Sequence, residues 1–473
     1  MALPGSGITS AASDRWRMSW NGSTGYRSAR SATGWSGTRR PIFRLSPLAA
    51  IPWRCPVSFR HETLPNGLEV IAEVSDSALS ASVGFFVNTG SRDEDDRTWG
   101  VSHFLEHMVF KGTENLSADD INRRFDDLGA AANAFTSEED TVYYASVLPE
   151  HQRDAVELIG TILRPALRED DFETEKLVIL EEIQMYDDQP PFGADDICRA
   201  AFFAGHPAAR SVLGTLDSVR GIGIDQMRDY HRLRYAPGNI VLAATGAIDF
   251  DDLLETAKRV CGDWQPCPAA SRACPLPPRA SGGGDEVICE QIVREAAAME
   301  YVIRLSAGPD GDDPDRYAAK WLAMMLGDES GSRFYWEFID SGAADYASCY
   351  HQEFLDAGVF GVHLSSDAES IEAIVERAEE ILADVTANGL TPSELEQARS
   401  KLASRIVLSG ERARRRLFGV GLEWAHSRRY RTVADDLSVV ESLTAADLGR
   451  LLERWPLSGS HATVLAGPLE SGA

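Results

Sequence analysis

A segment rich in proline, serine and glycine divides the chain, and the same order of predicted elements follows on each side of it. Residues 264–285 read WQPCPAASRACPLPPRASGGGD, a composition typical of a linker. Strands, a helix, further strands and long helices are expected both before and after this segment. With 473 residues, the chain is long enough for two or more domains. The recurrence therefore suggests two related halves that arose by an old duplication.

The first half carries the clearer signals of secondary structure. Asn66-Gly67 is a hairpin-turn dipeptide, and the residues after it alternate as in a strand. Ser117 and Gly129 are placed as the caps of a helix. The patterns predict strands within 59–74, 80–90 and 131–148, and helices at 100–113, 117–129, 151–167 and 171–189.

The second half opens with two predicted strands and continues with helices. Its strands are expected at 286–293 and 297–308, and its helices at 315–327, 370–389 and 391–410. Four segments result: a disordered or non-native N-terminal tail at 1–56, an N-terminal domain at 57–263, the linker at 264–285 and a C-terminal domain at 286–473.

The N-terminal tail differs in composition from the rest of the chain. It is rich in Ser, Gly, Arg and Trp and shows no sustained periodicity, which favours a disordered segment or sequence translated from a misplaced start. The alternative is a transit peptide at 1–55, since Arg- and Ser-rich, acid-poor segments have that signature. The first interpretation predicts a cytoplasmic protein of bacterial type, and the second a protein of the mitochondrial matrix.

The net charge of −27 is unevenly distributed. Residues 1–60 hold nine Arg, no Lys and one acid, a net charge of +8, so the remainder carries about −35. An acidic body argues against nucleic acid as a partner and would attract basic peptides, although it can also serve solubility alone.

No run of about 18 apolar residues exists, so no membrane span is expected. The seven scattered Cys form no C-x-x-C pair and are expected to be reduced thiols.

The stretch GVSHFLEHMVFKGT, residues 100–113, contains the sequence H-x-x-E-H. His103 and His107 are four residues apart, so on a helix both imidazoles lie on one face and can bind one metal ion. Glu106 lies three residues after His103, beside the same site. A catalytic zinc ion takes three protein ligands and keeps one position for water, whose pKa it lowers to about 7. Glu106 is then free to act as the general base on that water.

A third ligand must come from elsewhere, and the helix predicted at 171–189 offers carboxylates. Glu175 and Glu182 are seven residues apart and share a face. Apolar residues at 177–180 indicate that the helix is partly buried, and a buried carboxylate is costly unless it is paired or binds a metal. Glu182 is therefore the predicted ligand, with Glu175 in support and Glu181 as the alternative. Two histidines and an acid on an ordinary helix are the competing interpretation.

Together these stretches resemble the pitrilysin, or insulinase, family of zinc metallopeptidases (the M16 inverzincins), and most closely its processing-peptidase branch. The similar segments are, in order, the family's first strand, its catalytic helix with the lead-in loop, its N-A-x-T segment and its third-ligand helix. They correspond to residues 63–73, 90–113, 133–148 and 175–190. The resemblance extends from residue 57 to about 465 and is strongest in the first half.

This resemblance implies a zinc metalloendopeptidase with one Zn²⁺ per chain. The metal ligands would be His103, His107 and Glu182. Glu106 would activate the water, and Glu175 would assist nearby. Asn133 and Ala134 are implied to lie on an edge strand that pairs with the backbone of an extended peptide. The implied fold is α+β, with two homologous halves that each form a mostly antiparallel sheet with helices packed on one face.

The second half matches the family less closely. Tyr346 falls where the family often has a tyrosine that reaches the active site, but the family's arginine seven residues earlier is Ile339 here. The usual stabilisation of the oxyanion by this half is therefore open. Arg333 is present and is expected to hold structure.

Family members of this length pair as homodimers or with an inactive homologous subunit. Such a pair encloses a chamber that admits unfolded peptides, which the acidic body predicts to be basic. The alternative function is that of a non-catalytic structural or partner subunit of the same family. Inactive members of the family lack part of H-x-x-E-H, whereas the whole motif is present in this sequence.

Overall fold

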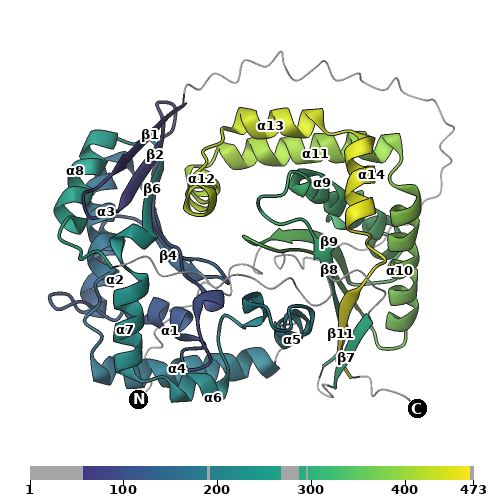
Figure 1. Ribbon diagram of the computed structural model, residues 1–473, viewed down its shortest axis with the longest axis horizontal. Helices are drawn as coiled ribbons and strands as arrows, with labels where there is room; N and C mark the ends of the chain where they lie inside the picture. The colour runs from purple at the N-terminus through teal and green to yellow at the C-terminus, as the bar shows by residue number, and fades with distance from the viewer. Residues whose placement is uncertain (1–56, 189–191, 268–286, 294–296, 469–473) are drawn as a thin grey trace, which may run out of the picture.

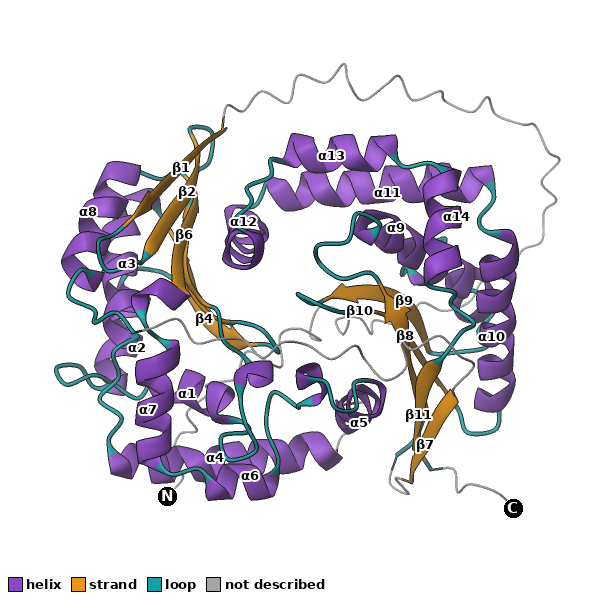
Figure 2. Cartoon of the chain, viewed as in Figure 1, coloured by secondary structure: helices purple, strands orange, loops and turns teal. Residues whose placement is uncertain are grey.

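The computed structural model describes residues 57–188, 192–267, 287–293 and 297–468. The predicted tail at 1–56 and the predicted linker beyond residue 267 lie outside these ranges. The described part contains two sheets, one in each half, with helices around them (Figure 1, Figure 2). No helix in these ranges is long and apolar enough to cross a membrane.

The first sheet is built from β1 (Val57–Thr63), β2 (Glu69–Ser75), β3 (Ala81–Val87), β4 (Ala131–Thr136), β5 (Thr141–Val147) and β6 (Ile240–Gly246). Their order across the sheet is β1-β2-β6-β3-β5-β4. β2 and β6 run parallel, and the other neighbours are antiparallel. The predicted hairpin joins β1 to β2, and its Gly67 adopts a φ of 94°, which suits glycine.

The described part of the first half also contains eight α-helices. They are α1 (Val101–Val109), α2 (Ala118–Asp127), α3 (Gln152–Ile162), α4 (Glu169–Asp188), α5 (Phe192–Phe202), α6 (Leu216–Gly221), α7 (Ile224–Arg234) and α8 (Phe250–Cys261). A short 3₁₀ turn, η4 (Ser91–Asp93), precedes α1. Apolar side chains of α1, α3 and α8 belong to the same core as Val83 and Phe85 of β3, both of which are fully buried.

The second sheet consists of β7 (Val287–Val293), β8 (Glu300–Gly308), β9 (Tyr346–Glu353), β10 (Gly358–Ser366) and β11 (His461–Gly467). Its helices are α9 (Arg316–Gly327), α10 (Ile371–Asn388), α11 (Pro392–Gly410), α12 (Ala413–Ser427), α13 (Val433–Ser442) and α14 (Ala445–Arg454). A π-helical turn, η9 (Tyr335–Ile339), lies between α9 and β9.

The two sheets have the same strand order. The second reads β7-β11-β8-β10-β9, which matches β2-β6-β3-β5-β4 strand by strand. The parallel pair also recurs, as β7–β11 in one half and β2–β6 in the other. Edge strand β4 thus corresponds to edge strand β9. The predicted fold of two homologous, mostly antiparallel halves is confirmed.

Each half also contributes one helix to the sheet of the other half. Helix α5 covers β8 and β11 of the second sheet, with Cys198 and Phe202 in that core. Helix α12 covers β3 and β6 of the first sheet, where a Cβ on Gly421 would meet the ring of Phe86 at 2.3 Å. The guanidinium of Arg416 on α12 also donates to the buried Glu73 carboxylate of β2 at 2.6–2.9 Å. Both faces of each sheet are therefore covered, one by its own half and one by the opposite half.

Candidate metal centre

Helix α1 is anchored by its apolar face and by a buried carboxylate at its N-terminus. Phe104, Leu105 and Met108 are buried in the first core. Glu94 accepts hydrogen bonds from the backbone N–H groups of Gly100 and Ser102, both at 2.7 Å. These two donors belong to the first turn, where a helix leaves its N–H groups without partners. The side chains of the H-x-x-E-H motif are thus carried by a helix fixed at its start and along its length.

Helix α4 brings a carboxylate to the two histidines of α1. Glu182 Oε2 lies 3.9 Å from His103 Nε2 and 3.8 Å from His107 Nε2. One ligand atom from each of these three residues lies within 4.8 Å of the others. Ligand atoms of a tetrahedral zinc site are about 3.4 Å apart, so small side-chain shifts suffice to complete the geometry. Glu181, the alternative, lies on the exposed side of α4.

The chemical state of His103 suits a metal, whereas the pKa of His107 is raised, because the opposing effect of burial is outweighed by contact with Glu175 and by nearby carboxylates. Burial lowers the pKa of His103 well below its usual value, so its imidazole is neutral near pH 7, as a metal ligand must be. Nδ1 of His103 has no hydrogen-bond partner within the described ranges. Nδ1 of His107 lies 2.9 Å from Glu175 Oε1, and Glu175 Oε2 lies 2.5 Å from Lys111 Nζ. Such a carboxylate partner holds the proton on Nδ1 and leaves Nε2 free to bind.

Glu106 lies beside this group, and its surroundings favour proton transfer. Its carboxylate is only 6% exposed and accepts a 2.6 Å hydrogen bond from the hydroxyl of Thr136 at the end of β4. Burial raises the pKa of Glu106 to about 7, although the Thr136 hydrogen bond lowers it in part. A carboxyl group with a pKa near neutrality can both accept and return a proton.

Strand β4 ends the first sheet next to this base. β4 pairs with β5 alone, in a register that sets Asn133 opposite Tyr144 and Ala134 opposite Tyr143. The backbone N–H of Ala134 donates to the Asn133 side chain at 2.9 Å. The predicted substrate residues thus lie on an edge strand that runs into Thr136 and, through it, to Glu106.

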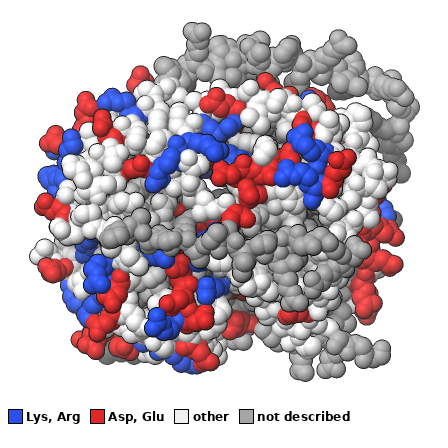
Figure 3. All heavy atoms as spheres, viewed as in Figure 1, with Lys and Arg blue, Asp and Glu red and all other residues white. Residues whose placement is uncertain are grey.

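A cavity of about 570 Å³ adjoins His103 and Glu106 and is walled by both halves. Its lining includes Thr136, Glu138, Asp195, Asp196 and Arg199 from the first half and Lys320, Tyr350, His351, Glu353 and His363 from the second. Five carboxylates and two permanent cations line it. Acidic and basic side chains are intermingled on the outer face shown in Figure 3.

The structure does not bring Tyr346 into this cavity. Tyr346 is 41% exposed at the start of β9, whereas the cavity is lined by Tyr350 to Glu353 at the other end of that strand. Ile339 packs against the second core. Arg333 pairs with Asp384 and Glu394, in keeping with a structural role.

Sequence reasoning missed several residues of this region. Thr136 is the last residue of the N-A-x-T segment, so its motif was visible but not its hydrogen bond to Glu106. Lys111, which pairs with Glu175, lies one helical turn after His107 and could have been placed beside the site by that spacing. Tyr350 and His363 come from the second half, and no local pattern connects them to α1.

The chain is similar to known proteins over most of its length. Residues 69–216 match the family model described as insulinase (peptidase family M16), and residues 221–402 match the peptidase M16 inactive domain. An uncharacterized zinc protease of Mycobacterium leprae is 31% identical, over 86% of this chain and 92% of its own length. The mitochondrial-processing peptidase subunit beta of Saccharomyces cerevisiae is 28% identical, over 80% of this chain and 83% of its own. The crystal structure of a protease from Helicobacter pylori superposes with a TM-score of 0.80 at 20% identity, over 87% of this chain and all of that one.

Proposed function

Because the chain belongs to the insulinase (M16) family of peptidases, we propose that it is a zinc-dependent endopeptidase that hydrolyses extended, basic, unfolded peptides. The observation that carries the proposal is the grouping of His103, His107 and Glu182 beside Glu106 on the wall of a cavity. The name of the relative from M. leprae supports zinc as the metal.

In this proposal, His103, His107 and Glu182 hold one zinc ion. When bound, zinc polarises the scissile carbonyl and lowers the pKa of water. Glu106 accepts the proton of the attacking water and returns it to the leaving amine, which suits a carboxyl group with a pKa near 7. Thr136 orients the Glu106 carboxylate, and Glu175 orients His107.

The substrate is proposed to add to the edge of β4 as an extended strand. Edge strands offer unpaired backbone groups, so pairing with Asn133 and Ala134 depends little on the peptide's side chains. Selectivity would come from the cavity, where carboxylates outnumber permanent cations five to two and so favour basic residues. In this scheme Tyr346, at the exposed start of β9, contacts longer substrates outside the cavity.

Assembly and location extend the proposal. We propose that the chain pairs, as a homodimer or with an inactive homologous subunit; the relative from S. cerevisiae is named as a beta subunit. The bacterial relatives support a cytoplasmic location, which stays a proposal. The mitochondrial alternative depends on residues 1–55, outside the described ranges. A non-catalytic partner subunit is the second candidate; the match to an inactive domain covers residues 221–402 and so does not include the H-x-x-E-H motif.

The substitution Glu106→Gln tests the catalytic proposal. The variant should keep one zinc per chain, measured by metal analysis, and lose essentially all hydrolysis of a basic, unstructured peptide. Hydrolysis by the variant at the wild-type rate would show that Glu106 is not the base. No hydrolysis by the wild-type chain, alone or with a homologous partner, would favour the non-catalytic candidate.

A further inference from the structure

Three consecutive acids are buried at the tip of the β4–β5 hairpin. Glu138, Glu139 and Asp140 are each at most 5% exposed, and Ser137 before them is also buried. Carboxylates are rarely buried unless they are paired. Each of these pairs with a basic side chain from a different element: Arg199 of α5, Arg92 of η4 and His426 of α12, respectively.

The first half holds one side of this tip through the backbone. Ser91 N–H and Arg92 N–H donate to the carbonyls of Ser137 and Glu138 at 3.2 and 3.0 Å. A Cβ on Gly90 would lie 2.2 Å from the Ser137 carbonyl oxygen, so a glycine is needed for this approach. The loop that leads into α1 therefore lies directly against the tip.

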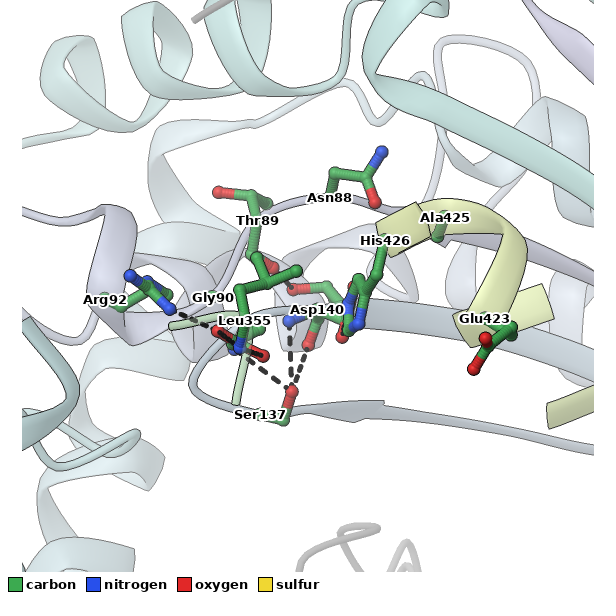
Figure 4. A network of polar contacts seen from close by, with 12 residues as sticks. Asn88, Thr89, Gly90, Arg92, Ser137, Asp140, Leu355, Glu423, Ala425 and His426 are labelled. Carbon is green, nitrogen blue, oxygen red and sulfur yellow. Dashed lines mark hydrogen bonds and ion pairs between the residues drawn. The ribbon is translucent and has the colours of Figure 1, made fainter. Parts of the chain in front are cut away.

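The second half holds the other side through the β9–β10 tip and through α12. Leu355 N–H donates to Glu139 at 3.0 Å, and Asp356 accepts from Arg92 Nη1 at 3.1 Å and Nη2 at 2.5 Å. Arg92 thereby bridges Glu139 of one half and Asp356 of the other. His426 Nε2 lies 2.8 Å from Asp140 Oδ2 (Figure 4). The tips of the two equivalent edge hairpins thus meet in one buried network.

This junction adjoins the catalytic end of β4. Thr136, whose hydroxyl donates to Glu106, is followed at once by Ser137. The junction therefore fixes the strand that carries both the substrate-pairing residues and the hydroxyl on the proposed base.

We propose that Asp356 is a positioning residue for the active site of the first half, acting through Arg92 and Glu139 on the β4–β5 tip. The second half then supports catalysis from a site that touches neither the metal ligands nor Glu106. This inference rests on the proposed peptidase function for its kinetic readout, but its structural readout does not depend on activity.

The substitution Asp356→Asn in the full chain tests it. Zinc content and circular dichroism should stay at wild-type values. Amide hydrogen exchange in residues 131–141 should become at least about fivefold faster, because the tip loses one of its anchors. For a basic peptide, kcat/KM should fall about tenfold or more, since small displacements of reacting groups have large kinetic effects. Asp356→Glu, which restores the charge, should recover part of both losses.

The matched control is Asp315→Asn, which removes a different ion-paired carboxylate of the second half, one that is fully buried. Asp315 pairs with Arg450 and Arg454, away from the tip. This variant should lower the melting temperature without changing exchange in β4 or kcat/KM. Unchanged exchange in β4 of Asp356→Asn, or an equal change in the control, would overturn the inference.

Two further arrangements keep the test decisive. A wild-type chain that cleaves no peptide would overturn the proposed function, whereas exchange in β4 would still test the positioning role. If Asp356→Asn does not fold, Arg92→Lys is measured in the same way, and the same changes are expected. This substitution keeps the charge but loses the bidentate contact with Asp356.

Discussion

Replacing Glu175 by glutamine should weaken zinc binding about tenfold without unfolding the protein. His107 is predicted to bind the metal through Nε2, and Glu175 does not contact that atom. Oε1 of Glu175 instead contacts Nδ1, on the far side of the ring, at 2.9 Å. A glutamine keeps the size of the side chain and one oxygen that can accept from Nδ1–H. The substitution therefore removes the negative charge and little else.

The magnitude follows from the two contacts of this carboxylate. A hydrogen bond to a charged group contributes about 1.5–3 kcal/mol, and a neutral one about 0.5–1.5 kcal/mol. The difference, about 1–2 kcal/mol, corresponds to a 5- to 30-fold change in the dissociation constant. Lys111, 2.5 Å from Oε2, already offsets part of the charge, so we expect a value near the middle of that range.

Competition with a chromophoric zinc chelator measures this change directly. Glu181→Gln is the matched control, because Glu181 lies on the same helix but on its exposed side. The control should bind zinc as the wild type does, and Glu182→Ala should lose most of its zinc. A zinc affinity of Glu175→Gln within twofold of the wild type would refute the orienting role of Glu175, and full zinc occupancy in Glu182→Ala would refute the ligand assignment.

Two further predictions concern pH and salt. Burial raises the pKa of Glu94 to about 8 from an unfolded value of 4.5, so its contribution to stability is present below about pH 4.5 and is lost as the pH rises through 8. The free energy of unfolding, measured with urea, should fall less between pH 5 and pH 8.5 in Glu94→Gln than in the wild type. Equal falls in the two proteins would contradict this. For an arginine-containing peptide, kcat/KM should fall several-fold between about 0.05 and 0.5 M NaCl, because salt screens the acidic cavity. A glutamate-containing peptide of the same length should not show that fall, and an identical fall for both peptides would exclude electrostatic selection.

Much of the site could be predicted because its pieces are local in sequence. Helical spacing alone places His103, Glu106 and His107 together, and the structure keeps this arrangement. Glu175 and Glu182 share a face of α4 for the same reason. Glu175 therefore contacts His107 while Glu182 lies close to His103 in the candidate metal site. The meeting of α1 with α4 was predicted from the buried carboxylates of α4 and then from the family resemblance, since no spacing rule connects helices far apart in the chain.

The exchange of α5 and α12 between the halves could not be predicted from periodicity. The apolar residues of α5, such as Cys198 and Phe202, recur every four positions and show only that one face is buried. The pattern does not say which sheet covers that face. A domain boundary at residue 263 therefore describes the chain order, whereas the packing unites the two halves through these helices.

The role of the second half follows from where its residues lie. Ile339 packs in the second core, and Tyr346 lies on the same face of β9 as Tyr350 but four residues, about 13 Å, away along the strand. Because residue 339 is isoleucine, an arginine and tyrosine pair does not occur at positions 339 and 346. What the second half does supply is one wall of the cavity, with Tyr350 and His363, and the buried contact of Asp356 with the β4–β5 tip. Both contributions come from the β9–β10 hairpin, which is the equivalent of β4–β5. In the proposed scheme, one edge hairpin therefore positions the other, and the latter binds the substrate.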